Sequence, residues 1–77
     1  MSTRVAVTGA GGFIGPALVR ALAGAGYLVS ALDLQARPDA LPAGVDWVRG
    51  SVTDPDALDA IVAGADCVVH LAFRMDL

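Results

Sequence analysis

Four short apolar runs divide the chain, and each ends at a glycine, an aspartate or a polar turn. They cover residues 5–8, 28–32, 45–48 and 67–72. Runs of four to six residues rich in valine and leucine are typical of strands. The first, second and fourth runs lack clean polar alternation, which is the pattern of strands buried in a parallel sheet.

A helix is predicted between the first two runs, over residues 13–25. Its apolar positions recur every three or four residues, which places them on one helical face. They are Ile14, Leu18, Leu22 and Ala25. Gly26 is placed to end this helix. Pro16 would lie in the first turn, where its missing N–H costs no intrahelical hydrogen bond.

A second helix is predicted between the third and fourth runs. Thr53 or Asp54 supplies a cap oxygen, and Pro55 fits the first helical position. Gly64 closes the helix. The predicted buried face consists of Leu58, Ile61 and Val62.

The order of elements predicts the fold. Residues 33–44 carry two prolines and a glycine, so we expect a loop or a single helical turn there. The elements follow one another as strand, helix, strand, loop, strand, helix and strand. This order implies right-handed crossovers in an α/β fold. We predict a partial Rossmann arrangement, a doubly wound parallel sheet with strand order 3-2-1-4. Its ligand would bind outside the carboxyl end of the first strand.

Glycines at positions 9, 12 and 15 form a G-x-x-G-x-x-G pattern where the first strand passes into the first helix. Gly9 can take the positive φ of a sharp turn, Gly12 lets the backbone approach a phosphate, and Gly15 lets the helix pack close against the sheet. The amides of about residues 12–14 and the helix dipole then hold a pyrophosphate without any lysine. The G-x-G-x-x-G spacing fails, because position 14 is Ile14.

Asp33 follows Gly9 by 24 residues, close to the spacing of an acid that bonds the adenine-side ribose. Its carboxylate can accept both ribose hydroxyls and would repel a 2′-phosphate. This favours NAD over NADP by roughly ten- to a hundredfold. Arg37 could reach a 2′-phosphate and so weakens the preference. The alternative is that Asp33 only forms the turn at the end of a strand.

Composition and charge narrow the choice of partners. The chain has 77 residues, of which 56% are hydrophobic and 17% charged, with a net charge of −3. Five scattered arginines and no lysine argue against a nucleic-acid partner or an anionic membrane surface. The uncharged run over residues 5–19 is too short for a membrane span. The one cysteine, Cys67, is expected to be a reduced, buried thiol, which fits a cytoplasmic location.

With these residues established, the chain resembles the extended short-chain dehydrogenase/reductase family, the NAD-dependent epimerases and dehydratases acting mostly on sugar nucleotides. Residues 8–15 look like the family's TGxxGFIG turn, and Asp33 matches its strand-2 acid. Residues 49–54 are similar to its G-D-[IL]-x-D segment, and residues 68–72 to its V-[IV]-H-L-A strand. Within that last pattern, His70 is a strand residue rather than a catalytic one.

The resemblance implies further contacts with the cofactor. They are Phe13 and Ile14 beside the pyrophosphate, Ser51 and Val52 flanking the adenine, and Leu71 and Ala72 near the ribose and phosphate. The family usually has an aspartate where Ser51 stands. A serine can still bond the adenine amino group, but without charge assistance, so a weaker adenine contact is expected.

Catalysis in this family depends on a Tyr-x-x-x-Lys pair with a serine or threonine. The chain has no lysine, and its one tyrosine, Tyr27, lies at the end of the first predicted helix. We therefore assign no catalytic residue and no metal ligand. Residues 1–77 are expected to be the N-terminal part of an NAD(P)-binding Rossmann domain, inactive alone, with the rest of that domain and a substrate domain absent. A small-molecule substrate and a homodimer are expectations for the full-length protein.

Two other functions are consistent with the same residues. One is a Rossmann module that senses NAD(P) without catalysis and regulates a partner. The other is a methyltransferase whose similar strand, glycine turn and helix hold S-adenosylmethionine. A P-loop nucleotidase is excluded, because no G-K-[ST] can occur in a chain without lysine.

Overall fold

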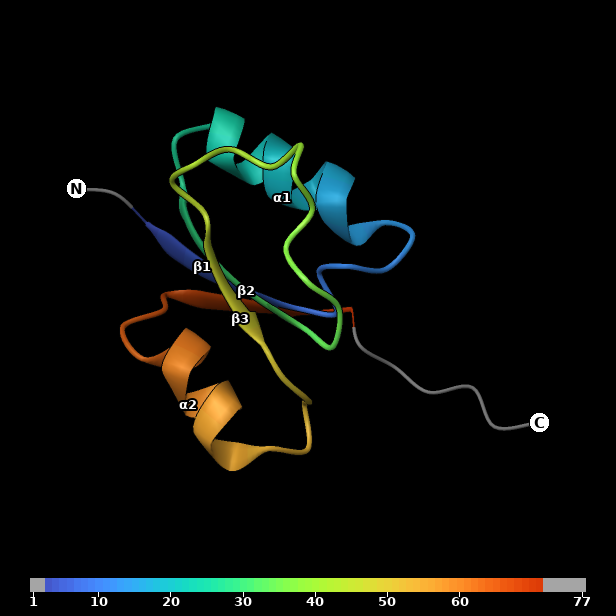
Figure 1. Cartoon of the computed structure of the whole chain (residues 1–77). Coiled ribbons are helices and arrows are strands. Elements are labelled where there is room, and N and C mark those ends of the chain that lie inside the picture. The colour runs from blue at the N-terminus through green and yellow to red at the C-terminus, as the bar shows by residue number, and fades with distance from the viewer. Residues whose placement is uncertain (1–2, 72–77) are drawn as a thin grey trace.

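Four parallel strands form one sheet in the order β3-β2-β1-β4. The strands of this computed structural model, which describes residues 3–71, are β1 (Arg4–Thr8), β2 (Leu28–Asp33), β3 (Asp46–Arg49) and β4 (Cys67–His70). Helix α1 (Gly15–Gly24) follows β1, and α2 (Pro55–Val62) follows β3. Figure 1 shows the two helices on opposite faces of the sheet. The predicted fold class and strand order are confirmed.

The two central strands are buried because both of their faces are covered. Val5 and Val7 of β1 belong to the apolar cluster under α1, which also contains Val19 of that helix. Ala6 and Leu32 belong to the opposite cluster, together with Ile61 of α2. This alternation explains why these strands read as nearly continuous apolar runs.

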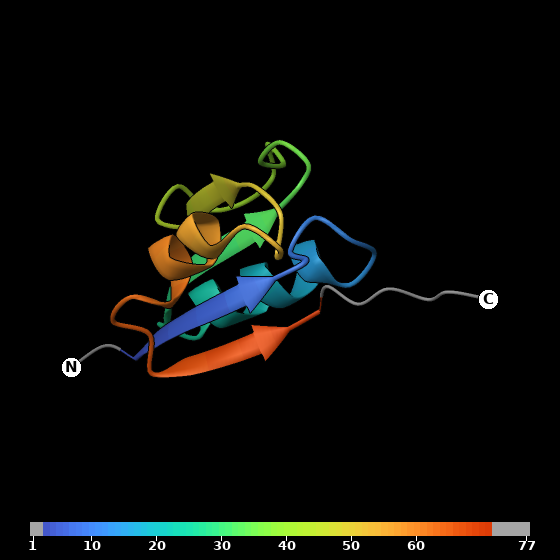
Figure 2. The same ribbon diagram turned by 90° about the horizontal axis from the view of Figure 1, so that it is seen from below.

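The register brings the carboxyl ends of the strands to one edge of the sheet. Thr8 pairs with Leu32 of β2 on one side and with His70 of β4 on the other. In Figure 2 the arrowheads of the strands point toward the same edge, where the turn from β1 to α1 also lies. The loops that follow β1, β2 and β3 therefore meet there.

Helix α1 begins two residues later than the sequence pattern predicts, with Ile14 as its N-cap. Pro16 lies in the first turn as expected. Gly26 ends the helix with a φ of 96°. The amide of Tyr27 then donates to the Leu22 carbonyl over 3.1 Å. Such a glycine-centred end satisfies carbonyls that the helix itself leaves open.

The buried face of α1 differs from the prediction. Gly15 and Val19 are its buried residues, whereas Ile14 is 62% exposed and Ala25 is also exposed. The prediction was wrong about these two positions, because both lie outside the helix proper. The helical face that contacts the sheet is centred on Val19, with Leu18 and Leu22 beside it.

Helix α2 begins as predicted, with Asp54 as the cap and Pro55 at the first position. Ala57 and Ile61, four residues apart, face the sheet. Val62 is 37% exposed, so its predicted burial is wrong. It lies about 100° around the helix from Ile61, beyond the contact with the sheet.

The segment between β2 and β3 is a loop with turns, as predicted. It also completes the core, because Leu41 and Val45 are buried in the cluster under α1. The Arg37 guanidinium holds the loop by donating to the carbonyls of Pro38, Leu41 and Pro42 at 3.2, 2.9 and 2.5 Å. This side chain is thus engaged within its own loop rather than free to meet a ligand phosphate.

Strand β4 lies at an edge of the sheet and makes its extensive contacts with β1. Its predicted burial is wrong, because Cys67, Val68 and His70 are exposed. The thiol of Cys67 is free, as expected, but it is not buried. No helix within residues 3–71 has the length and apolar character needed to cross a membrane.

Candidate functional site

The turn between β1 and α1 is built around glycines. Gly9 has a φ of 70°, the positive value predicted for it. The next residue, Ala10, donates its amide to the Leu32 carbonyl over 3.1 Å, which ties the turn to β2. A methyl group at Gly15 would lie 2.1 Å from the Ala10 carbonyl oxygen. Glycine is therefore required at position 15 by a close contact with the turn itself.

The start of α1 leaves backbone donors open. The N-cap Ile14 makes no side-chain capping bond, and the first turn has no acidic residue. The amides of Phe13 and Ile14 donate to no acceptor within residues 3–71. The Gly12 amide, in contrast, donates to the Gly9 carbonyl over 3.2 Å. Of the three amides predicted to face an anion, two are thus open, at the positive end of the helix dipole.

Asp33 lies at the end of β2 and joins two loops. One carboxylate oxygen accepts the Gly11 amide at 3.0 Å, and the other accepts the Gln35 amide at 2.9 Å. Because a carboxylate offers about four acceptor sites, both oxygens keep capacity for further donors. Asp33 therefore acts as the former of the strand-end turn and still presents a charge to the edge of the sheet.

Gly11, to which the sequence analysis assigned no role, lies in close contact with the site residue Asp33. A methyl group there would lie 2.8 Å from the Asp33 carboxyl carbon and from one of its oxygens. Only glycine lets the turn approach the carboxylate this closely. The signal available in the sequence is a further glycine in the turn, although it does not complete a G-x-G-x-x-G pattern.

The loop after β2 is fixed by side chains from β3. The Trp47 indole donates to the Gln35 carbonyl at 3.1 Å, and Arg49 Nε donates to the Leu34 carbonyl at 3.0 Å. Leu34 is held at the edge of the site with 68% of its surface exposed. It is a second residue that the sequence analysis missed, since an isolated leucine in a loop gives no signal. Trp47 also packs against the cluster under α1.

The loop after β3 contributes Gly50, Ser51 and Val52. The Gly50 amide donates to the Asp33 carbonyl over 2.8 Å. The Ser51 hydroxyl accepts the Thr53 amide at 3.1 Å and lies 2.7 Å from the Thr53 hydroxyl. Val52 packs against the cluster under α2. The loop is thus anchored on both sides and holds Ser51 in a defined position.

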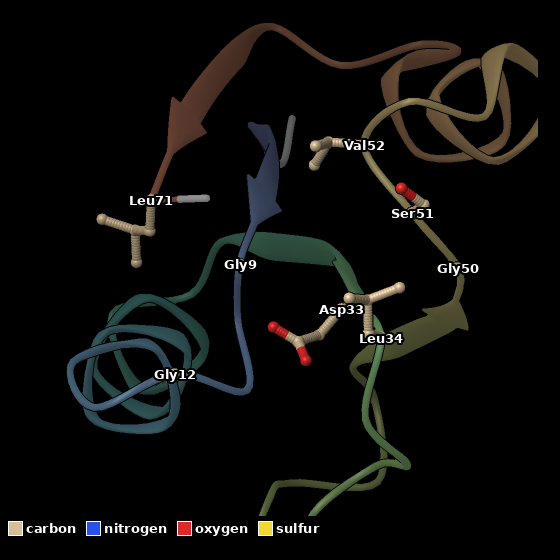
Figure 3. A pocket seen from close by; sticks show the side chains of 8 residues that line it. All are labelled: Gly9, Gly12, Asp33, Leu34, Gly50, Ser51, Val52 and Leu71. Carbon is tan, nitrogen blue, oxygen red and sulfur yellow. The ribbon is translucent and has the colours of Figure 1, made fainter. Parts of the chain in front are cut away.

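These loops enclose two adjoining pockets, which we call the groove. The first has a volume of about 250 Å³ and contains Asp33 as its one charged residue among those described. Its lining is Gly9, Gly12, Asp33, Leu34, Gly50, Ser51, Val52 and Leu71 (Figure 3). The second has a volume of about 300 Å³ and lies over the start of α1. Its lining is Gly9, Gly12, Phe13, Ile14, Gly15 and Leu71.

The structure brings together every predicted site residue that it describes. All nine lie in the groove, and Gly9, Gly12 and Leu71 belong to both pockets. The tenth, Ala72, lies outside the described residues. Leu71 is placed by its amide, which donates to the Thr8 carbonyl over 3.0 Å.

His70 has a structural partner. Its Nδ1 lies 2.5 Å from the hydroxyl of Thr8, which is buried at the end of β1. The side chain is thus satisfied at the end of its strand, as predicted. Within residues 3–71, no group of three histidine, cysteine or acidic side chains is arranged to hold a metal ion.

Comparison with known proteins decides the family. Residues 5–76 match the sequence model of the NAD dependent epimerase/dehydratase family. The chain belongs to this family. Its solved neighbours are extended short-chain dehydrogenases/reductases, so the resemblance seen in the motifs is confirmed.

Several relatives of this family member have known activities. It is 42% identical over 67 residues to 2-alkyl-3-oxoalkanoate reductase of Stenotrophomonas maltophilia, covering 87% of this chain and 20% of that one. Uronate dehydrogenase of Agrobacterium tumefaciens, solved with NAD, superposes with a TM-score of 0.79 at 31% identity, covering 100% of this chain and 29% of that one. MoeE5, solved with UDP-glucuronic acid and NAD, gives a TM-score of 0.79 at 35% identity, with coverages of 92% and 23%.

The chain spans about a fifth to three tenths of the length of these relatives. Residues 5–76 of this chain, which match the family model, include all the residues that line the groove. Members of the family are NAD-dependent oxidoreductases, epimerases and dehydratases. The solved neighbours have Rossmann folds, which agrees with the sheet order of this chain.

Proposed function

We propose that this chain forms the part of an NAD-dependent enzyme that binds the adenosine diphosphate half of the cofactor. The observation that carries the proposal is the groove itself. It places two open backbone amides, at Phe13 and Ile14, next to a pocket whose charged wall is Asp33. A nucleoside diphosphate carries an anionic diphosphate next to the two hydroxyl groups of its ribose. The open amides suit the diphosphate, and the Asp33 carboxylate suits the hydroxyl groups.

The diphosphate fits the pocket over the start of α1. Open amides and the helix dipole favour an anion there, and no acidic residue stands in the first turn to compete. Phe13 and Ile14 are exposed and line this pocket. Binding through backbone groups also accounts for an anion site in a chain without lysine.

The ribose fits beside Asp33. Each carboxylate oxygen has one amide partner and can accept a second donor, so both ribose hydroxyls can be bound while the loop contacts persist. The same charge disfavours a 2′-phosphate, and Arg37 is already engaged by three carbonyls of its own loop. We therefore propose NAD rather than NADP as the preferred cofactor.

The adenine fits against the wall formed by Ser51 and Val52. In an adenosine diphosphate the ribose lies between the base and the phosphates. With the phosphates over α1 and the ribose at Asp33, the base must lie toward the loop after β3. Figure 3 shows Ser51 and Val52 across the pocket from Gly9 and Leu71. Val52 offers apolar surface to a planar base.

Titration of the complete gene product that carries residues 1–77 tests this proposal. We expect calorimetry to show binding of NAD and ADP-ribose, with adenosine at least about tenfold weaker because it lacks the diphosphate. A site for S-adenosylmethionine would instead show no requirement for phosphate. Failure of both NAD and ADP-ribose to bind would refute the proposal.

Asp33→Asn provides the second test, because it removes the charge and keeps one of the two oxygens that accept the Gly11 and Gln35 amides. The preference for NAD over NADP should fall by about ten- to a hundredfold. Asp39→Asn is the matched control, since Asp39 is an exposed loop carboxylate outside the groove. Unchanged relative affinities for the two cofactors in Asp33→Asn would contradict the assignment of the ribose site.

We further propose that the complete protein is an enzyme that uses this cofactor, which supplies a hydride acceptor and donor, on a sugar-nucleotide-like substrate. The family and the ligands of uronate dehydrogenase and MoeE5 support this. Chromatography of the products formed from nucleoside-diphosphate sugars would test it, with NADH absorbance as a second readout, because an epimerase or dehydratase returns the hydride to its substrate and leaves no net NADH. Binding of NAD without turnover of any reducible or oxidisable substrate would favour the sensor alternative. A homodimer and a cytoplasmic location stay predictions.

A further inference from the structure

We propose that the hydrogen bond between Thr8 and His70 sets the register of β4 against β1 and thereby positions Leu71 in the groove. The two residues would then act on cofactor affinity without contacting the cofactor, as positioning residues. The inference rests on the proposed function, since it concerns the walls of the same groove. It arises from the one hydrogen bond between side chains that joins these two strands within residues 3–71.

Thr8 holds the end of β4 in two ways. Its hydroxyl lies 2.5 Å from Nδ1 of His70, and its carbonyl accepts the Leu71 amide at 3.0 Å. Thr8 is 1% exposed, so water cannot take the place of either partner. Gly9, the next residue, and Leu71 each line both pockets of the groove. The two bonds therefore set the distance between two walls of the groove.

The surroundings of Thr8 determine the direction of the bond to the ring. Among the described residues, His70 is the only hydrogen-bond partner of the Thr8 hydroxyl. The buried hydroxyl proton needs an acceptor, and Nδ1 provides one only when the ring proton is on Nε2. His70 is exposed, so Nε2–H can donate to water. One neutral tautomer thus satisfies every polar group of the pair.

The apolar pattern of β4 does not fix its register. Side chains alternate between the faces of a strand, so a shift by two residues keeps each of them on its face. Such a shift would put Val69 where Leu71 now lies and would move Leu71 by about 6.6 Å. Both residues pack against the cluster under α1, so burial distinguishes poorly between the two registers.

The polar pair does distinguish between the two registers. In the shifted register Val68 would lie opposite Thr8, and the buried hydroxyl would have no partner. An unsatisfied buried hydroxyl costs more free energy than a typical hydrogen bond contributes. At the other end of the strands, the Arg4 amide donates to the Asp66 carboxylate at 2.9 Å, but this contact is exposed and water can replace it.

Thr8→Val is the first test, because it removes the hydroxyl and keeps the branched shape. Calorimetric titration of the complete gene product that carries residues 1–77 should show NAD affinity reduced by about three- to tenfold. The midpoint of urea denaturation should change little, since the exposed His70 ring can bond to water. Thr8→Ser keeps the hydroxyl and should restore the affinity.

Val68→Thr is the matched control, since it changes an exposed position of the same strand and should leave affinity and midpoint unchanged. Undiminished NAD affinity in Thr8→Val would overturn the inference and leave the proposed function intact. Failure of the unmodified protein to bind NAD would overturn both.

A double variant separates positioning from stability. His70→Leu leaves the Thr8 hydroxyl without a partner and should lower both the NAD affinity and the urea midpoint. Adding Thr8→Val removes that hydroxyl and should restore the midpoint. The affinity should stay low, because no polar pair selects the register. Recovery of affinity together with the midpoint would show that the pair only stabilises the fold, and would overturn the proposal.

Two local measurements complete the test. Hydrogen exchange of the Leu71 amide should be faster in Thr8→Val than in the unmodified protein, while the amides of β2 keep their protection. In protein labelled with ¹⁵N-histidine, Nδ1 of His70 should be unprotonated, its resonance being assigned by its loss in His70→Asn. An unchanged exchange rate at Leu71, or a neutral ring with its proton on Nδ1, would contradict the proposal.

Discussion

The two helices of this chain begin in opposite ways. Helix α2 starts with Asp54, whose side chain accepts the Asp56 amide at 3.0 Å, and Asp56 adds a second negative charge in the first turn. Helix α1 starts with Ile14, which provides no capping side chain, and has no acidic residue in its first turn. One helix start is satisfied by its own side chains, and the other is left open.

The difference shows how the same element can serve stability or binding. An open helix start has unsatisfied amides, which water or a ligand must satisfy. At α1 this open start lies at the carboxyl edge of the sheet (Figure 2), and its residues line the groove. At α2 the cap closes the corresponding position, and none of the groove-lining residues belongs to that helix. Substitutions that exchange these properties test the comparison.

The largest effect is expected for Gly15→Ala at the start of α1. The added methyl group would lie 2.1 Å from the Ala10 carbonyl oxygen, and the backbone cannot yield without disrupting the turn. We expect a loss of about 2–4 kcal/mol in the free energy of unfolding, together with loss of dinucleotide binding. Urea denaturation and calorimetry measure the two effects.

Gly24→Ala is the control for this substitution, since a methyl group at Gly24 meets no atom within 4 Å. It should leave binding unchanged and raise the free energy of unfolding by up to about 1 kcal/mol, as expected for alanine in place of glycine in a helix. Equal behaviour of the two alanine variants would show that the contact at Gly15 is not required.

A smaller effect is expected for Ile14→Asp, which gives α1 an acidic start like that of α2. The carboxylate would occupy the positive end of the helix and repel a diphosphate, so dinucleotide affinity should fall by about tenfold or more. Stability should stay constant or rise by about 0.3–1 kcal/mol. Ile14→Asn introduces a similar polar shape without charge and should cost much less affinity. Undiminished binding by Ile14→Asp would place the diphosphate elsewhere.

The smallest effect is expected for Asp54→Ala, which opens the start of α2. Loss of the cap should lower the free energy of unfolding by about 1 kcal/mol. Affinity for the dinucleotide should not change, because Asp54 does not line the groove. Asp59→Ala removes an exposed carboxylate from the same helix without removing a cap and should have little effect on stability. A fall in affinity with Asp54→Ala would contradict the separation of the two helix starts.

Sequence patterns predicted the features that depend on neighbouring residues. The strand order follows from the alternation of strands and helices, and the ends of both helices follow from Asp54, Gly26 and Gly64. The glycine turn and the acid at the end of β2 were recognisable because each has a fixed place relative to a strand. The nine described site residues meet in the groove for the same reason.

Features that depend on distant contacts were not predictable. The burial of Leu41 and Val45 depends on how an irregular loop folds back under α1. The exposure of Cys67 depends on its strand lying at the edge of the sheet, although its apolar neighbours indicate burial. The contact between Gly11 and Asp33 joins residues that are 22 positions apart, and no periodic pattern in the sequence indicates it.

Asp33 contacts all three loops that form the groove. Its side chain accepts the amides of Gly11 and Gln35, and its carbonyl accepts the amide of Gly50. The walls are therefore preorganised around a single residue before any ligand enters. A ligand that binds there loses little of its interaction free energy to the ordering of flexible segments, which is how modest surface areas achieve useful affinity.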